Sequence, residues 1–189
     1  MARPIVRFER ISIDNLKNVG HGEISFSNPR RPEGASVLGM YGQNGSGKST
    51  LIDALEMVQG CMEGRRLDRR FAQLVSVGAD YGAVECELSV SQPDGSNLYR
   101  VLYSFKVKSE PDETESKSEE KSEERFVLRV FDERLAVAND SPGKKSRMTT
   151  LIDTSGGGAF GPVAKYKQLI GKDPEDSVEL TVEKRLAYR

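Results

Sequence analysis

The chain has 189 residues, of which 37% are hydrophobic and 30% charged, and its formal net charge is −1. This length is enough for one domain with a real core, and the near-neutral charge gives no overall basic field that would favour nucleic acid. No apolar run in the charged N-terminus is long enough for a signal peptide or a membrane span. The sequence therefore predicts a soluble protein with no membrane partner. The two cysteines, Cys61 and Cys86, lie far apart without metal-binding spacing, and this usage predicts the reducing cytoplasm.

Two short strands are predicted near the N-terminus. Residues 5–13 alternate apolar and polar positions, as a half-buried strand does. Residues 14–22, DNLKNVGHG, are rich in turn-forming residues, and residues 22–27 offer Ile24 and Phe26 for a second strand. We therefore expect a strand, a long turn and a second strand.

A buried strand and an amphipathic helix are predicted on the two sides of the sequence GQNGSGKST. Residues 36–42, SVLGMYG, form a short apolar run without alternation, which favours a strand buried on both faces. From Lys48 onward, apolar residues recur at helical spacing, and the pattern stops at Gly60. The predicted buried face of this helix consists of Leu51, Ile52, Leu55 and Val58.

Residues 42–49 satisfy the phosphate-loop pattern G-x-x-x-x-G-K-[ST]. Glycines let successive backbone N–H groups converge into a nest for phosphate oxygens, and the N-terminus of the following helix adds partial positive charge. Lys48 is expected to reach the β and γ phosphates, Ser49 to ligate Mg²⁺ and Thr50 to contact the α phosphate. The alternative is an accidental glycine-rich turn, but the predicted flanking strand and helix favour a nucleotide site. The predicted nucleotide-binding residues are Gly42, Gln43, Asn44, Gly45, Ser46, Gly47, Lys48, Ser49 and Thr50.

The middle of the chain predicts a series of antiparallel strands. In GAVECELSV, apolar and polar residues alternate with a period of two, and the dipeptide Asp94-Gly95 is a hairpin signal. The predicted strands cover residues 71–77, 82–90, 97–107 and 125–137.

Two later segments lack a strong structural pattern. Residues 108–125 contain acids and bases but no apolar side chain, so they cannot offset their ordering entropy by burial and predict a disordered acidic loop. An acidic docking tract is the functional alternative. Residues 140–189 hold one more apolar run and a glycine cluster, and the tail stops within apparent secondary structure. We therefore expect a single lobe over residues 1–189 whose end is truncated or split.

The stretch YGQNGSGKSTLIDALEMV, preceded by FERISIDNLKNVGHGEISFS, resembles the N-terminus of ABC-type ATPases of the SMC, RecF and OLD class. That class includes AAA-family ATPases of bacterial defence and DNA-repair loci. Its members open with a strand of the form I-x-I-x-N-[FL]-[KR], followed by a second strand, the phosphate loop and a helix. The resemblance covers roughly residues 5–139. The matching positions are Ile11, Ile13, Asn15, Leu16, Lys17 and Asn44.

The resemblance implies an α/β fold of the P-loop NTPase (ABC-type) kind, in which a phosphate-loop strand and helix accompany an antiparallel β subdomain. It also implies ATP with Mg²⁺, and a nucleotide held between two protomers arranged head to tail. In such proteins the residues after the first strand, here Lys17 and Asn18, approach the base or ribose. A lysine in an ordinary surface turn is the alternative.

An ABC-type site needs further parts: a Q-loop glutamine, an apolar strand ending in Asp-Glu, and a signature motif from the partner protomer. The nearest Asp-Glu pair is Asp132-Glu133, which we interpret as exposed positions at a strand end. Gln73, Gln92 and Gln168 are equivalent candidates for the glutamine. The sequence therefore assigns no catalytic residue.

The segment TLIDTSGGG offers a second interpretation. Asp153 begins a D-x-x-G pattern, which in a compact GTPase or nucleotide kinase would contact the metal. The chain has no N-K-x-D guanine-reading motif, and an aspartic-protease interpretation of the same residues leaves the phosphate loop unexplained. A strand running into a glycine loop is the structural interpretation.

Two groups of polar residues remain. His21 lies between glycines and is interpreted as a solvent-facing loop residue. The concentrated basic patch is expected either to contact a DNA backbone or to be a solvated surface. It consists of Arg65, Arg66, Arg69 and Arg70.

The sequence as a whole predicts a Mg·ATP-binding module, the N-terminal half of an SMC/RecF/OLD-like ATPase. Hydrolysis is expected to need a missing second half or a partner, either a second copy or a different chain, that supplies the signature and Asp-Glu motifs. DNA repair and phage defence are the processes that the resemblance suggests. The alternatives are a GTPase or kinase that uses Asp153, and a nucleotide-gated interaction module of a defence or toxin-antitoxin system.

Overall fold

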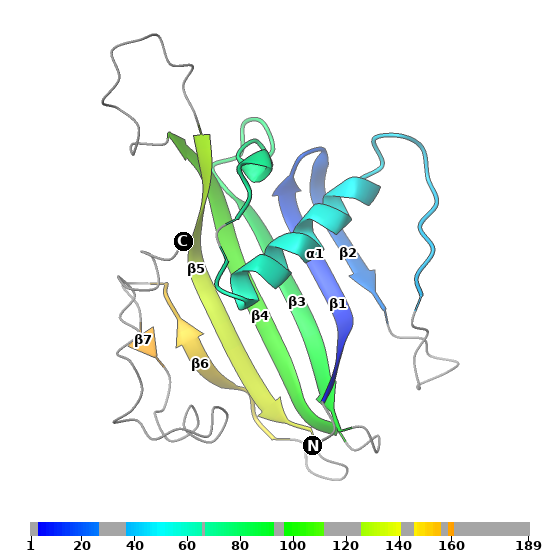
Figure 1. The fold of residues 1–189 in the computed structure, drawn as a ribbon, viewed down its shortest axis with the longest axis vertical. Helices are drawn as coiled ribbons and strands as arrows, with labels where there is room; N and C mark the ends of the chain where they lie inside the picture. The colour runs from blue at the N-terminus through cyan, green and yellow to red at the C-terminus, as the bar shows by residue number, and fades with distance from the viewer. Residues whose placement is uncertain are drawn as a thin grey trace.

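In the computed structural model, one long helix lies across one face of an antiparallel sheet (Figure 1). The structure describes residues 4–26, 37–65, 67–92, 97–111, 126–140, 146–155 and 159–160. In these residues the strands are β1 (Ile5–Leu16), β2 (Val19–Ser25), β3 (Gly82–Ser91), β4 (Asn97–Pro111), β5 (Phe126–Asn139), β6 (Thr149–Asp153) and β7 (Ala159–Phe160). The helices are α1 (Lys48–Met62) and the short 3₁₀ helix η1 (Arg69–Phe71). The sheet order is β2-β1-β3-β4-β5-β6-β7, with every neighbouring pair antiparallel.

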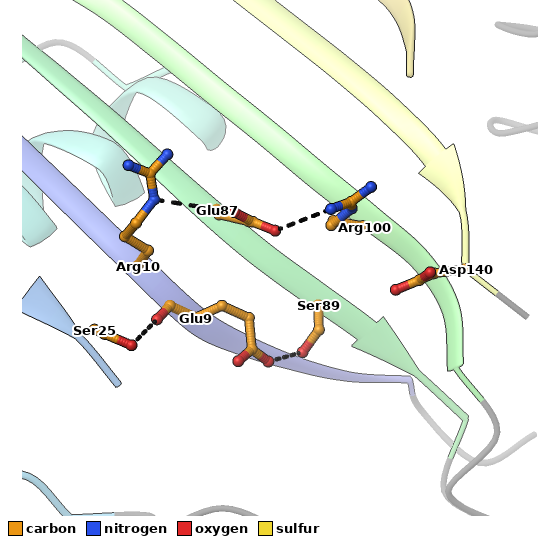
Figure 2. A pocket seen from close by; sticks show the side chains of 7 residues that line it. All are labelled: Glu9, Arg10, Ser25, Glu87, Ser89, Arg100 and Asp140. Atoms are coloured by element: carbon orange, nitrogen blue, oxygen red, sulfur yellow. Dashed lines mark hydrogen bonds and ion pairs between the residues drawn. The ribbon is translucent and has the colours of Figure 1, made fainter. Parts of the chain in front are cut away.

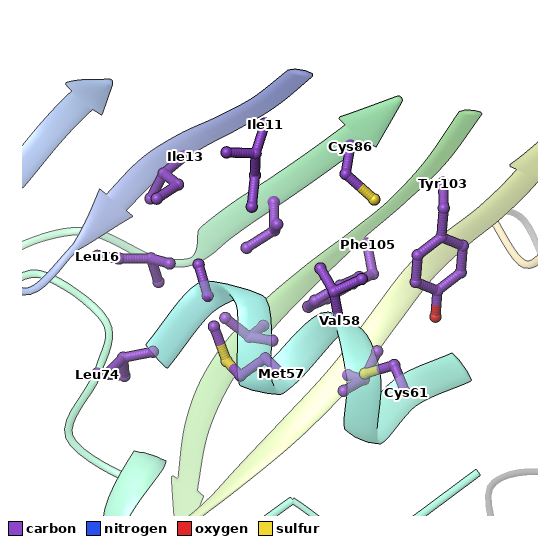
Figure 3. Close-up of a cluster of buried hydrophobic side chains, with 14 of the residues drawn as sticks. Ile11, Ile13, Leu16, Met57, Val58, Cys61, Leu74, Cys86, Tyr103 and Phe105 are labelled. Atoms are coloured by element: carbon purple, nitrogen blue, oxygen red, sulfur yellow. The ribbon is translucent and has the colours of Figure 1, made fainter. Parts of the chain in front are cut away.

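The core lies between α1 and the sheet (Figure 3). β3 confirms its predicted period of two, because Val84, Cys86 and Leu88 are buried towards the helix while the intervening residues are only partly buried. From the helix side, Met57 and Cys61 point into the same cluster. The shared burial of two apolar surfaces is what holds the helix on the sheet.

The first hairpin is tighter than predicted. The long turn expected over residues 14–22 is wrong, because β1 and β2 stay paired up to Leu16 and Val19. Only Lys17 and Asn18 connect the strands. Lys17 adopts a φ of 50°, the left-handed conformation that tight two-residue hairpin turns require. His21 lies in β2 rather than in a loop, and its Nδ1 lies 2.6 Å from Asp14 Oδ1 across the strand pair.

The buried strand predicted over residues 36–42 is also wrong for the part that the structure describes. Residues 37–42 form no strand, and the side chains of Val37 and Tyr41 are 84% and 97% exposed. β1, the strand that carries the hairpin beside the phosphate loop, already has β2 on one side and β3 on the other. An apolar run signals burial but does not say which strand will pair with it, and the described sheet supplies none for this segment.

Two predicted details of the helix and its sequel need correction. The helix ends at Met62 rather than at Gly60, and Ile52, expected in the core, is 53% exposed. The strand predicted over residues 71–77 is instead η1 and a turn with one isolated bridge, between Leu16 and Val75. Phe71 and Leu74 are both buried, and their spacing of three suits a helical turn rather than a strand. The helix's buried residues are Thr50, Leu51, Ala54, Met57, Val58, Gly60 and Cys61.

The prediction of a disordered acidic loop over residues 108–125 is wrong for residues 108–111. β4 continues to Pro111, so residues 108–111 belong to a strand that pairs with the start of β5. Charges replace apolar burial here: Glu110 forms ion pairs with Lys108 and Arg129, and the Lys108 hydrogen bond is the main cause that lowers the pKa of Glu110. Residues 112–125 lie outside the described residues, as do Asp94-Gly95 and everything after residue 160.

Candidate nucleotide-binding site

The phosphate loop connects residues 37–42, which are exposed except for the half-buried Met40, to the start of α1. Gly45 and Gly47 have φ values of 84° and 88°, which L-residues with side chains rarely adopt. Gly47 is the N-cap of α1, no side chain caps this end, and the first turn carries no acidic residue. The free N–H groups at this end of the helix therefore present an uncompensated partial positive charge, which suits an anion.

Lys48 lies across the loop that precedes it. Its Nζ donates hydrogen bonds to the carbonyl oxygens of Gly42 and Gln43, both at 2.7 Å, and to Ser46 Oγ at 3.2 Å. A Cβ on Gly42 would lie 2.8 Å from Ser46 Oγ, so a larger residue there would displace the Ser46 hydroxyl from its contact with Lys48. The result is an ammonium group held in the mouth of the nest, where phosphate oxygens would need a cation.

The two residues after Lys48 differ in exposure. Ser49 is exposed in the first turn of α1, as a metal ligand would need to be. Thr50 is only 1% exposed, so its side chain packs inward. The Mg²⁺ contact of Ser49 and the α-phosphate contact of Thr50 stay predictions.

The turn between β1 and β2 lies directly against the phosphate loop. Asn18 donates a hydrogen bond from its Nδ2 to the carbonyl oxygen of Gly45, and Lys17 forms an ion pair with Asp53 of α1. A Cβ on Gly47 would lie 2.7 Å from Val19 Cγ2. The structure thus brings Lys17 and Asn18 to the phosphate loop, while their predicted contact with a base or ribose stays a prediction. The sequence pattern did not predict the contact of Asp53 with Lys17 or that of Val19 with Gly47.

The Asp132-Glu133 pair is not at an exposed strand end, contrary to the sequence interpretation. Both residues lie within β5, where Asp132 has a φ of 48° next to a register shift, and Glu133 is 2% exposed. Tyr103 donates a hydrogen bond to Glu133 Oε1 at 2.5 Å. β5 is three strands from β1, roughly 14 Å across the sheet. The buried carboxylate therefore belongs to the core and not to the phosphate loop.

Asp153 is farther still from the phosphate loop. It ends β6, four strands from β1, which corresponds to roughly 19 Å across the sheet. Its carboxylate accepts hydrogen bonds from the Ser155 hydroxyl at 2.5 Å and the Ser155 backbone N–H at 3.0 Å, and these lower the pKa of Asp153. This local turn occupies the carboxylate, so the geometry gives no support to Asp153 as a metal ligand for the loop.

The candidate glutamines gain no role from the structure. Gln73 lies exposed in the turn after η1, and Gln92 follows the end of β3. Gln168 lies outside the described residues.

The arginine patch is largely balanced by acids. Arg65 forms an ion pair with Glu63, and Arg70 pairs with Glu56 while its guanidinium lies 4.6 Å from the centre of the Phe71 ring. Arg69 is exposed beside them, and Arg66 lies outside the described residues. Pairing reduces the field that would attract a phosphate backbone, and the DNA contact stays a prediction.

A separate depression of about 470 Å³ lies on the sheet face away from α1 (Figure 2). Arg10 pairs with Glu23 and Glu85 at its edge, and Arg100 lies 3.7 Å from Glu87, but the buried Nε of Arg100 has no hydrogen-bond partner among the described residues. The hydrogen bond with Glu23 is the main cause that raises the pKa of Arg10. Its chemistry is therefore unlike that of the uncapped phosphate loop. The lining residues are Glu9, Arg10, Ser25, Glu87, Ser89, Arg100 and Asp140.

Comparison with known families decides the broad class of this site. A family model described as an AAA domain matches residues 10–180, which include the phosphate loop, α1 and the antiparallel sheet. The chain belongs to the AAA-domain family. This membership confirms the coarse prediction of an AAA-type, SMC-like, ATP-binding ATPase module, and the α/β architecture fits a P-loop-like fold. No curated protein and no solved structure matches the chain significantly.

The length of the helices bears on the predicted absence of a membrane span. In the part of the chain that the structure describes, no helix has the length and apolar character needed to cross a bilayer.

Proposed function

We propose that this AAA-domain chain binds Mg·ATP at residues 42–50 and acts as the N-terminal half of an ABC-type ATPase of the SMC/RecF/OLD class. The observation that carries the proposal is the uncapped N-terminus of α1, preceded by two left-handed glycines and bridged by Lys48. These groups suit a triphosphate because they gather hydrogen-bond donors and a fixed cation, with no acid in the first turn of the helix.

The phosphates and the Mg²⁺ would each have a partner in this loop. The nest and the start of α1 hold the phosphates, and Lys48 neutralises charge on the β and γ groups. Ser49 is the residue of this chain that would hold Mg²⁺, which supplies further charge neutralisation between the same two phosphates. Lys17 and Asn18 form the nearby wall of the site.

Hydrolysis would need groups from a second half or a partner chain. The carboxylate of Asp53, on the first turns of α1, is held by Lys17, and the carboxylates of Glu133 and Asp153 lie several strands away. We therefore propose that a second copy or a different chain supplies the general base and the signature motif. The apolar residues Val37, Leu38 and Tyr41 support this proposal, because they lie within five residues of one another and are 84%, 49% and 97% exposed. Exposed apolar side chains gathered in this way favour a covering partner.

The test is Mg·ATP affinity, measured by isothermal titration with the full chain. The wild type is expected to bind, and Lys48→Ala is expected to lose binding because it removes the cation of the nest. Lys108→Ala is a matched control, since Lys108 is a partly exposed lysine on β4 with its own ion pair to Glu110. Equal affinities of the wild type and Lys48→Ala would contradict the assignment.

A nucleotide-gated interaction module is the second candidate. The exposed side chains of Val37, Leu38 and Tyr41 favour it, because the segment that carries them leads directly into the loop that would sense the nucleotide. If the module is of this kind, ATP changes the oligomeric state measured by light scattering without being consumed.

A further inference from the structure

We propose that the turn between β1 and β2 is a positioning element for the phosphate loop, in which Asn18 fixes the Gly45–Ser46 peptide in its phosphate-binding orientation. This inference rests on the proposed nucleotide site and goes further, because it assigns Asn18 to the shape of the loop rather than to the base or ribose.

The turn is held firmly from behind. The backbone N–H of Lys17 donates to Leu74 O at 2.6 Å, and Ser76 Oγ donates to Lys17 O at 2.8 Å. Leu16, which precedes the turn, is 0% exposed and forms the isolated bridge with Val75. The turn is therefore held by its own two strands and by residues 74–76, and it is a fixed platform rather than a free hairpin tip.

From this platform, three successive residues contact the phosphate loop and its helix. Lys17 pairs with Asp53, Asn18 donates to Gly45 O, and Val19 occupies the space where a Cβ of residue 47 would stand. Contacts at the loop and at the first turns of the helix together fix how the loop enters α1.

Asn18 acts on one particular peptide group. The carbonyl of Gly45 accepts the Asn18 hydrogen bond, and the N–H of Ser46, in the same planar peptide, donates to Gln43 O at 3.2 Å. Because both ends of the peptide have partners, its plane cannot rotate freely. A carbonyl turned into the nest would repel phosphate oxygens, so holding this one outward keeps the nest in a binding shape.

The same contacts indicate that Asn18 and Lys17 act on the phosphate loop and its helix rather than on the base. The Asn18 amide is engaged by Gly45 and the Lys17 ammonium by Asp53. Their influence on affinity therefore passes through the part of the site that binds phosphate, and it is independent of whether a nucleoside is attached.

The experiment compares Mg·ATP with Mg·tripolyphosphate, a ligand without base or ribose, by isothermal titration. Asn18→Ala is expected to lower the affinity for both ligands by the same factor, about 5- to 10-fold, which corresponds to the loss of roughly one hydrogen bond. Gln59→Ala is the matched control, because it removes an exposed amide from α1 about three turns beyond the loop and is expected to change neither affinity.

The outcomes distinguish the two proposals. If Asn18→Ala weakens ATP and leaves tripolyphosphate unchanged, Asn18 contacts the nucleoside and the inference is overturned; unchanged binding of both ligands overturns it as well. In either case, binding by the wild type and its loss in Lys48→Ala leave the proposed function standing. A wild type that binds neither ligand overturns both.

Hydrogen exchange provides a readout that holds even if Asn18→Ala is less stable. Loss of the fixing contact should speed amide exchange at Ser46 while β1 and β3 stay protected. Uniform acceleration through the sheet would instead assign Asn18 to general stability and overturn the inference. Asn18→Asp, which keeps the side-chain size but removes the donor, should show the same local effect and bind both ligands more weakly than Asn18→Ala.

Discussion

The sheet with its covering helix and the phosphate-loop segment are built on opposite principles. Between α1 and the sheet, large side chains such as Phe105 and Leu16 are at most 1% exposed, and even the buried Glu133 has a hydrogen-bond donor. Residues 37–50 instead expose Val37 and Tyr41, and the N-terminus of α1 lacks a side-chain cap. The side of the sheet that faces α1 is satisfied within the chain, while the phosphate-loop segment presents groups that suit a ligand and a covering partner.

The sharpest way to break this comparison is to truncate one aromatic residue in each region. Phe105→Ala removes a ring that is 1% exposed and should lower the free energy of unfolding by about 3–5 kcal/mol. Tyr41→Ala removes a ring that is 97% exposed and should change it by less than about 0.5 kcal/mol. Urea denaturation measures both. Similar losses would mean that Tyr41 is packed within the chain and that the second region is not open.

Alanine substitutions at two glycines test whether ATP binding requires the observed conformation of the phosphate loop. Gly47→Ala forces a side chain onto a φ of 88° and against Val19, at a cost of about 1–3 kcal/mol, and should abolish Mg·ATP binding by displacing the start of α1. Gly20→Ala, in β2, meets no atom within 4 Å and should bind normally. Thermal unfolding and titration of both variants provide the measurement. Normal binding by Gly47→Ala would contradict the loop geometry.

The pH dependence of stability should come from the closed region. Burial, with a smaller effect of Glu85, raises the pKa of the Cys86 thiol to about 12. In the unfolded chain the thiol ionises at about pH 8.5, so the unfolded state loses this proton first as the pH rises. Between that pH and about pH 12, the free energy of unfolding therefore falls by roughly 1.4 kcal/mol per pH unit. Below about pH 8 the thiol is protonated in both states, and ionisation of Cys86 takes nothing from the free energy of unfolding.

Cys86→Val removes this contribution and tests it. Urea midpoints measured between pH 8 and 11 should fall less steeply in the variant than in the wild type. Identical slopes would mean that the Cys86 thiolate is not disfavoured by the core.

A small loss of stability is expected at the surface arginines. Arg70→Ala breaks an exposed ion pair with Glu56 and should cost at most about 1 kcal/mol of stability. If the patch binds DNA, the same variant weakens duplex binding at low salt, whereas Arg10→Ala, on the other face of the sheet, does not. Fluorescence anisotropy with a labelled duplex measures this. Equal binding by the wild type and Arg70→Ala would remove Arg70 from the DNA proposal.

The sequence predicted the parts of this molecule in which a local pattern decides the structure. The period of two in β3 and the phosphate-loop spacing are local signals, and both elements lie where they were expected. The pattern failed over residues 37–42, because burial of an apolar run depends on a pairing strand that local sequence does not specify. It also failed over residues 71–77, where a spacing of three at Phe71 and Leu74 was read as part of a strand.

The candidate site shows the same division. Lys48 and its glycines could be found from their spacing, whereas the contacts of Lys17 with Asp53 and of Val19 with Gly47 arise only when the hairpin folds back on the helix. The predicted exposure of Glu133 is wrong, because in sequence a charged pair after an apolar run resembles an exposed strand end. In the structure, the irregular backbone at Asp132 directs the Glu133 side chain into the core.

The most direct test of the central proposal measures ATP binding and ATP turnover in the same concentrated sample of the chain, with Lys48→Ala as the background. Saturable Mg·ATP binding by the wild type, with turnover no faster than that of Lys48→Ala, is the predicted result, because the loop holds phosphates while the general base comes from elsewhere. Turnover well above that background, or no binding at all, would contradict the proposal that this chain is one half of an ATPase site.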